Sequence, residues 1–323
     1  MEEISLTPEE VAIRLKIAKN TVYELIKRGD LPAYRVGRKI RVDLKDVEAY
    51  KKQGKKVELT LEDTAPVPGL TREVVPRQTI NTANEIHDSR ELVICGQDVL
   101  LDILTRHLER HPHGTRAFRH YVGSFPGLLA LYQENVDMAA IHLWDGDTGV
   151  YNIPYVRRLL PGIPAMIIHL ACRMQGFYVA KGNPKNIKDW HDLTRRDIRF
   201  INREKGSGTR VLLDEKLRLL GLDRRLINGY HVEGPSHLAI ASAVARGDAD
   251  VGLGNEKVSM QVRGIEFVPL QKEHYELVMK KEDIHKPCFQ AVLEILQSRE
   301  FKKELEGLGD YDLNETGKIV AEI

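Results

Sequence analysis

The chain has 323 residues and a formal net charge of +1, with 42% apolar and 29% charged residues. A chain of this length forms two or three domains, and its apolar content excludes wholesale disorder. The net charge conceals a split, because residues 1–56 carry 14 basic and nine acidic side chains and the other residues carry 34 and 38. A small basic module joined to a larger, slightly acidic one indicates a polyanionic partner for the first and a different task for the second.

The N-terminal segment is acidic and amphipathic and lacks the apolar centre of a secretory signal, and no apolar run is long enough to span a membrane. Cys95, Cys172 and Cys288 are widely spaced and odd in number, as expected of reduced thiols. We therefore predict a cytoplasmic protein without a membrane span or a disulfide framework.

Residues 1–53 have the pattern of a compact helical domain with a hairpin. Residues 7–10, Thr-Pro-Glu-Glu, form a helix start with Thr as N-cap and Pro in the first turn. A second helix begins at Lys19 or Asn20 and ends before Gly29. Two short strands around a turn at residues 37–38 follow, and then a helix over residues 44–53. A short helix of this kind can enter the major groove of DNA while a basic hairpin meets the backbone.

Residues 6–50 resemble, nearly end to end, the helix-turn-helix domain of the excisionase/MerR-like family. In that family, residues like those at 20–23 open the recognition helix, and segments like residues 29–38 form the turn and wing. Nine basic residues between Arg14 and Arg41 face only two acidic ones. The resemblance implies a double-stranded DNA operator as partner. The predicted DNA-binding residues lie on the second helix and the hairpin: Lys19, Asn20, Thr21, Tyr23, Lys27, Arg28, Arg35, Arg38, Lys39 and Arg41.

Residues 54–91 are punctuated by prolines and are predicted to be a linker, with a possible role in dimerisation. From Leu92 to the C-terminus, strands and helices alternate, which favours an α/β domain with mainly parallel sheets.

Three glycine-containing loops follow predicted strands of this second region, at residues 96–98, 123–124 and 206–210. Ligands of open α/β sheets sit at the carboxyl ends of strands, where helix N-termini offer free N–H groups. The third loop lacks the Lys of a Walker loop and the spacing of a dinucleotide fingerprint, so NTP and NAD sites are not supported. Taken alone, such loops are more often turns and caps than ligand sites.

The order of motifs from Leu92 onward resembles the periplasmic-binding-protein-like domain found in cytoplasmic regulators and beside molybdopterin-synthesis enzymes. The motifs are Gly123-Ser124, residues 139–143, 147–152, 182–184, 202–210 and 249–254. The resemblance implies a multidomain α+β and α/β protein, with an N-terminal winged helix-turn-helix (1–53) and a two-lobed type II binding domain (92–323). Lobe 1 would comprise about 92–175 and 273–323, and lobe 2 about 176–272, with the ligand between them.

Relatives of this fold include molybdate and tungstate binders, which hold a tetrahedral dianion with hydroxyls and backbone amides. Carried over by position, Ser124 would serve from lobe 1 and Ser207 and Thr209 from lobe 2. Asp98 stands where a Ser is common in the oxyanion binders, and a carboxylate beside a dianion costs energy unless it is protonated or turned away. The full predicted ligand set is Gln97, Asp98, Ser124, His142, Tyr151, Arg203, Ser207, Gly208, Thr209 and Arg210.

His107, His111 and His113 do not form a convincing metal set, because Pro112 interrupts the helix and no Cys or carboxylate completes a tetrahedron. We predict no metal site, no cofactor and no catalytic residue. The predicted function is a ligand-responsive, homo-oligomeric transcriptional regulator that senses a molybdate- or tungstate-like oxyanion. Two alternatives remain open: an organic metabolite or pterin-like effector, favoured by Asp98 and the nearby aromatic residues, and an enzyme acting on that ligand.

Overall fold

The computed structural model describes residues 5–15, 19–28, 31–36, 39–47, 50 and 91–323. These residues belong to two compact units, Met1–Ala83 and Asn84–Ile323, and each unit is described by itself. The predicted linker, residues 54–91, lies outside the described residues apart from Glu91.

The N-terminal unit packs two helices on a three-stranded antiparallel sheet. The strands are ordered β1-β3-β2, and the elements are β1 (Ser5–Leu6), α1 (Pro8–Leu15), α2 (Lys19–Arg28), β2 (Tyr34–Val36) and β3 (Lys39–Asp43). Residues 44–47 continue in a helix, and most of the predicted remainder of that helix lies outside the described residues. Strand β1, which the sequence did not reveal, pairs with β3 and places Ser5 opposite Asp43.

The first helix begins where the sequence predicts. The Thr7 hydroxyl accepts a hydrogen bond from the Glu10 backbone amide at 3.3 Å, and the Glu10 carboxylate accepts one from the Thr7 amide at 2.7 Å. This reciprocal pair satisfies two amides that a helix start leaves unbonded. The core beneath the helices is apolar and consists of Val11, Ala12, Val22, Leu25, Leu31, Val42 and Val47.

The second unit is built on one nine-stranded mixed sheet. Its strand order is β5-β4-β6-β11-β7-β10-β8-β9, with β12 added beside β7. The strands are β4 (Leu92–Cys95), β5 (Ala117–His120), β6 (Met138–Ile141), β7 (Ala165–Ala180), β8 (Phe200–Arg203), β9 (Glu233–Gly234), β10 (Val251–Asn255), β11 (Ile265–Lys280) and β12 (Ile319–Glu322). The two outer groups, β5-β4-β6 and β10-β8-β9, pair in parallel, whereas β6-β11, β11-β7 and β7-β10 are antiparallel.

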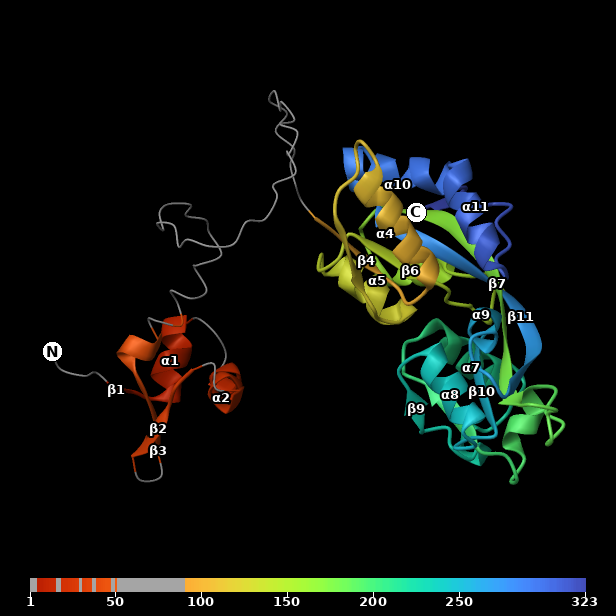
Figure 1. Ribbon diagram of the computed structural model, residues 1–323, viewed down its shortest axis with the longest axis horizontal. Helices are drawn as coiled ribbons and strands as arrows, with labels where there is room; N and C mark the ends of the chain where they lie inside the picture. The colour runs from red at the N-terminus through yellow and green to blue at the C-terminus, as the bar shows by residue number, and fades with distance from the viewer. Residues whose placement is uncertain (1–4, 16–18, 29–30, 37–38, 48–49, 51–90) are drawn as a thin grey trace, which may run out of the picture. The chain divides into compact units, whose positions relative to one another are not determined.

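Strands β7 and β11 run side by side from one lobe to the other (Figure 1). Each has 16 residues. A Cβ atom at Gly176 would lie 2.2 Å from the Val268 carbonyl oxygen, and the register of the pair shifts between Pro269 and Gln271. The lobe boundaries expected near residues 175 and 272 thus fall inside these two strands.

Helices surround each half of the sheet. Figure 1 shows α4, α5, α10 and α11 around the first lobe and α7, α8 and α9 around the second. The helices are α4 (Val99–Arg110), α5 (Ser124–Tyr132), α6 (Ile153–Leu159), α7 (Gly208–Leu219), α8 (His237–Ala245), α9 (Glu256–Ser259), α10 (Pro287–Gln297) and α11 (Arg299–Leu308), with 3-10 turns at Trp190–Thr194, Arg224–Leu226 and Lys281–Asp283. None of the described helices is long and apolar enough to cross a bilayer.

Candidate ligand site between the lobes

A cavity of about 30 Å³ lies between the lobes of the second unit. Its lining comes from strand ends and helix starts of both lobes: Gly96, Gln97, Asp98, Val122, Gly123, Ser124, Ala140, His142, Arg173, Arg203, Ser207, Gly208, His237, Asn255 and Tyr275. The lobes touch around it. The Phe125 amide donates to the Gly206 carbonyl at 2.9 Å, and the Arg203 guanidinium donates to the Gln97 side-chain oxygen at 2.6 Å. The described conformation is therefore a closed one.

Two glycines permit this close approach of the lobes. A Cβ atom at Gly123 would lie 2.9 Å from the Ser207 Cα, and one at Gly208 would lie 2.6 Å from the His142 ring. Both distances are shorter than real side chains allow, so any other residue at either position would push the lobes apart.

Three helices begin at the cavity wall, namely α5 at Ser124, α7 at Gly208 and α8 at His237. The caps of α7 and α8 are the Ser207 and Ser236 side chains, whereas the cap residue of α5 is Gly123, which has no side chain to accept a bond. Helix N-termini carry partial positive charge and unbonded N–H groups. Their convergence makes the cavity attractive to a small anion.

A buried ion cluster forms another wall of the cavity. The Arg173 guanidinium contacts the Asp98 carboxylate and lies 2.5 Å from the Glu273 carboxylate, and Glu273 also lies 2.6 Å from His142 Nδ1. The same guanidinium stacks over the Tyr275 ring at 4.0 Å. These charged side chains are nearly inaccessible to solvent, so each depends on its neighbours for charge compensation.

The cluster changes the ionisation of its members. Burial alone would raise the pKa of the Glu273 carboxyl, but Arg173 and His142 lower it to about 2. Burial, followed by repulsion from Arg203, holds the pKa of His237 well below its usual range. His237 is therefore neutral near pH 7, and its buried Nδ1 makes no hydrogen bond to the described part of the chain. A ligand in the cavity can use that nitrogen.

Seven of the ten predicted ligand residues line the cavity, namely Gln97, Asp98, Ser124, His142, Arg203, Ser207 and Gly208. Two of the hydroxyls also have structural partners. The Ser124 oxygen accepts from the His142 amide at 3.2 Å, and the Ser207 oxygen caps α7 by accepting from the Arg210 amide at 3.2 Å.

The other three predicted residues do not line the cavity. The Tyr151 ring stacks on His274, with its hydroxyl accepting a hydrogen bond from Gln271 at 2.8 Å. Thr209 lies one residue into α7, and its hydroxyl donates to the Gln175 side chain at 3.4 Å. The Arg210 guanidinium pairs with Asp214 and Glu233.

Sequence reasoning missed three polar lining residues, Arg173, Asn255 and Tyr275, and left His237 out of the predicted ligand set. Asn255 ends β10, so its place at the carboxyl end of a strand was a usable signal. Arg173 interrupts an otherwise apolar run, which also marks it as unusual. His237 follows the Ser cap of α8.

A second cavity, of about 180 Å³, adjoins the first and shares Gln97, Asp98, His237 and Asn255 with it. Lys257 lies among its other lining residues.

The predicted DNA-contacting residues are described in part. Lys19, Thr21 and Tyr23 are exposed on α2, and Arg41 is half-buried on β3. Lys19 pairs with Glu9 of α1. The side chains of Asn20, Lys27, Arg28, Arg35 and Lys39, and the whole of Arg38, lie outside the described residues.

Family comparisons match both units. A model of the PBP superfamily domain matches residues 105–297, and a model of a helix-turn-helix domain matches residues 5–55. The uncharacterised protein YvgK of Bacillus subtilis is 43% identical over 321 residues, which cover 99% of each chain. A Mycobacterium tuberculosis protein described as DNA-binding is 52% identical over 42 residues, 13% of this chain and 54% of that protein.

Among solved structures, a protein described as a phosphate ABC transporter substrate-binding protein from Clostridium perfringens, with bound phosphate, is similar to this chain. The TM-score is 0.51 and the identity 14%, over 69% of this chain and 99% of that one. Together the comparisons confirm the predicted combination of a helix-turn-helix domain with a two-lobed domain of the periplasmic-binding-protein type.

Replacing Glu273 by Gln tests the ion cluster. We expect Glu273→Gln to destabilise the second unit by about 3–5 kcal/mol at pH 7, because it leaves Arg173 buried with one carboxylate fewer. Urea unfolding followed by tryptophan fluorescence measures this loss, since both tryptophans, Trp144 and Trp190, lie in this unit.

The difference in free energy of unfolding between the wild type and Glu273→Gln should decrease as the pH falls. The pKa of Glu273 is lowered from 4.5 to about 2, so its ionised form stabilises the fold fully above pH 4.5 and progressively less as the pH falls toward 2. The gap between wild type and variant should narrow over that window. The control, Glu315→Gln, removes an exposed carboxylate that pairs with Lys318 and should leave the unfolding midpoint unchanged. A gap independent of pH would contradict the role given to Glu273.

Proposed function

Because the chain belongs to the PBP superfamily and carries a helix-turn-helix domain at its N-terminus, we propose that it is a DNA-binding regulator controlled by a small oxyanion of the molybdate or tungstate type. The observation that carries the choice of effector is the small closed cavity onto which three helix N-termini open.

Cavity size favours a compact ligand. A space of about 30 Å³ holds only a few water-sized groups, which is on the scale of a tetrahedral ion. The donors around it are of the kind that hold oxyanions: helix amides, the Arg203 guanidinium and the neutral His237 ring.

A carboxylate such as Asp98 would normally repel an anion, but the contacts of Asp98 compensate its negative charge. One of its carboxylate oxygens accepts from the Leu100 amide at 2.8 Å and from the Tyr311 hydroxyl at 2.6 Å. The other oxygen contacts Arg173. With both oxygens engaged by donors, the charge is compensated within the wall of the cavity.

The regulatory step in this proposal is closure of the lobes. Ligand would stabilise the closed conformation and so alter how the DNA-binding domains of a homodimer, or higher homo-oligomer, engage two half-sites in the cytoplasm. The effect on DNA affinity equals the difference in ligand affinity between the two arrangements. Binding and release of the oxyanion, rather than its chemical conversion, are all that this mechanism requires.

Isothermal titration calorimetry of the full-length protein tests the effector. We expect molybdate or tungstate to bind once per chain with micromolar or tighter affinity. Gly123→Ala should weaken this binding by about tenfold or more, because the added Cβ prevents full closure against Ser207.

The matched control is Gly307→Ala, since a Cβ atom at Gly307 in α11 meets no atom within 4 Å. That variant should bind like the wild type. If no oxyanion binds at micromolar concentrations while an organic metabolite does, the choice of effector is wrong. Turnover of the bound compound would instead point to an enzyme.

The basic hairpin generates a prediction for DNA. Arg38→Ala combined with Arg41→Ala should weaken binding of the full-length protein to duplex DNA and lower the salt dependence of log K by about two, one phosphate contact for each arginine. Fluorescence anisotropy over a range of salt concentrations measures both quantities.

The charge-matched control is Arg299→Ala combined with Lys303→Ala, two exposed residues of α11 in the second unit. It should leave the salt dependence unchanged. If the salt dependence of log K is unchanged in the hairpin variant, the hairpin does not contact DNA.

A further inference from the structure

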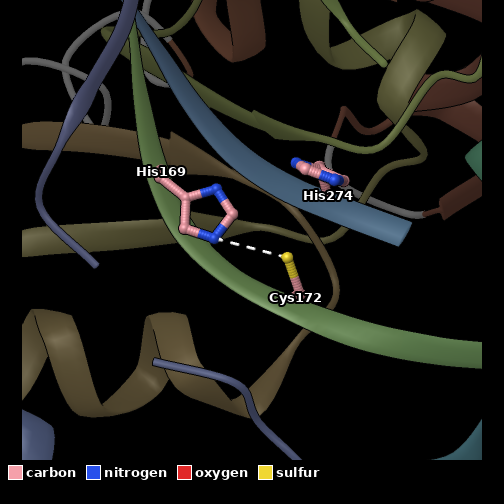
Figure 2. Close-up of side chains that lie close together, drawn as sticks. All are labelled: His169, Cys172 and His274. Carbon is pink, nitrogen blue, oxygen red and sulfur yellow. Dashed lines mark hydrogen bonds between the residues drawn. The ribbon is translucent and has the colours of Figure 1, made fainter. Parts of the chain in front are cut away.

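We propose that His169, Cys172 and His274 form a binding site for one transition-metal ion of borderline or soft character, such as Zn²⁺. Figure 2 shows His169 and Cys172 on β7 and His274 on the neighbouring β11, with the His169 ring and the Cys172 thiol pointing toward each other. Their ligand atoms all lie within 4.8 Å of one another.

The spacing fits a tetrahedral ion. His169 Nε2 lies 3.6 Å from Cys172 Sγ. Zinc binds thiolate sulfur at about 2.3 Å and imidazole nitrogen at about 2.0–2.1 Å, and two such bonds at a tetrahedral angle place the nitrogen and sulfur about 3.6 Å apart. The separation of these two atoms therefore matches that of two ligands of one tetrahedral zinc ion.

The strand pairing fixes the third ligand. Cys172 and His274 are directly opposite in the antiparallel ladder of β7 and β11. His169 lies three residues earlier on β7, opposite Glu276, and the register shift between Tyr275 and Glu276 brings it to the face that carries Cys172 and His274. Side chains alternate along a strand, so the neighbouring pair, Arg173 and Glu273, points to the other face. The ligand cavity and the metal site thus occupy opposite faces of the same ladder.

The carboxylate of Glu276 lies near the Nδ1 atoms of both histidines. The Glu276 carboxylate oxygen Oε1 lies 3.8 Å from His169 Nδ1 and 4.0 Å from His274 Nδ1. Glu276 is itself buried, and its other oxygen accepts a hydrogen bond from the Asn152 amide at 2.7 Å. Both distances are longer than a hydrogen bond, but the negative charge of this carboxylate favours a proton on Nδ1 of each ring, which leaves Nε2 free to bind a metal.

The site has an inner and an outer side. His169 and Cys172 are buried, whereas 47% of the His274 side chain is exposed to solvent. The exposed side provides a path of entry and a fourth position for water. One thiolate with two imidazoles selects Zn²⁺ or Cu⁺ over Mg²⁺ and Ca²⁺, which prefer oxygen ligands. On binding, the Cys172 thiol gives up its proton to solvent and the sulfur bonds the ion.

A bound ion would cross-link the two strands that join the lobes. It would link β7 to β11 four residues from Gly176, where a Cβ atom would lie 2.2 Å from the Val268 carbonyl oxygen of the other strand. Sequence motifs did not reveal this set because Cys172 and His274 come from strands far apart in the chain.

Cobalt titration of the reduced, metal-free, full-length protein tests the site. Co²⁺ serves as a coloured substitute for Zn²⁺. We expect one Co²⁺ per chain, a near-ultraviolet sulfur-to-cobalt charge-transfer band, intense visible bands of a tetrahedral ion, and loss of colour when Zn²⁺ is added. Cys172→Ser should abolish the charge-transfer band.

His274→Ala provides a second variant that keeps the fold, because the replaced ring is half-exposed. It should weaken Zn²⁺ affinity about tenfold or more in competition with a chromophoric chelator. The controls are Cys288→Ser, at a half-buried thiol elsewhere, and His111→Ala, in the histidine-rich segment 107–113. Circular dichroism checks that each variant is folded.

The proposal is overturned if the wild type shows no charge-transfer band. It is also overturned if the band survives Cys172→Ser, if His274→Ala binds Zn²⁺ like the wild type, or if either control variant abolishes binding. None of these readouts depends on the identity of the ligand between the lobes.

Discussion

The antiparallel pairing of β7 with β11 is the constraint on which the second unit depends. Each strand has 16 residues and, at about 3.4 Å per residue, is long enough to pass through both lobes. Its register places Arg173 opposite Glu273 and Cys172 opposite His274. One ladder therefore joins the lobes, supplies the charged wall of the ligand cavity on one face, and brings the proposed metal ligands together on the other.

The buried charges explain how a slightly acidic unit can favour an anion. Arg173 is compensated by Asp98 and Glu273, so it does not supply a free positive charge. Attraction then comes from short-range donors: the starts of α5, α7 and α8 and the neutral His237, together with Arg203, whose charge is itself paired with Glu204. Such donors act only on a ligand that fits among them, so selectivity depends on the closed shape of the cavity. Gly123 and Gly208 are decisive because a side chain at either position would prevent that closure.

Features set by neighbouring residues could be predicted from the sequence. The Thr7 cap, the loops with Gln97 and Ser124 that follow predicted strands, and the helix start at Ser207 all depend on local patterns. The structure places Gln97, Ser124 and Ser207 at the cavity. Thr209 and Arg210 belong to the predicted ligand set, but each helical step beyond Ser207 turns a side chain by about 100°, and neither residue lines the cavity. Arg173 and Tyr275 depend on the β7–β11 register, which no local pattern specifies.

The central claim is that closure of the lobes on an oxyanion is coupled to DNA binding. It is tested most directly by measuring the affinity of the full-length protein for a duplex selected from a random pool, with and without saturating tungstate. The account predicts a change of about fivefold or more, the scale of a typical coupling free energy, and no change in Gly123→Ala. Equal DNA affinities for a wild-type protein that calorimetry shows to be loaded with tungstate would contradict it.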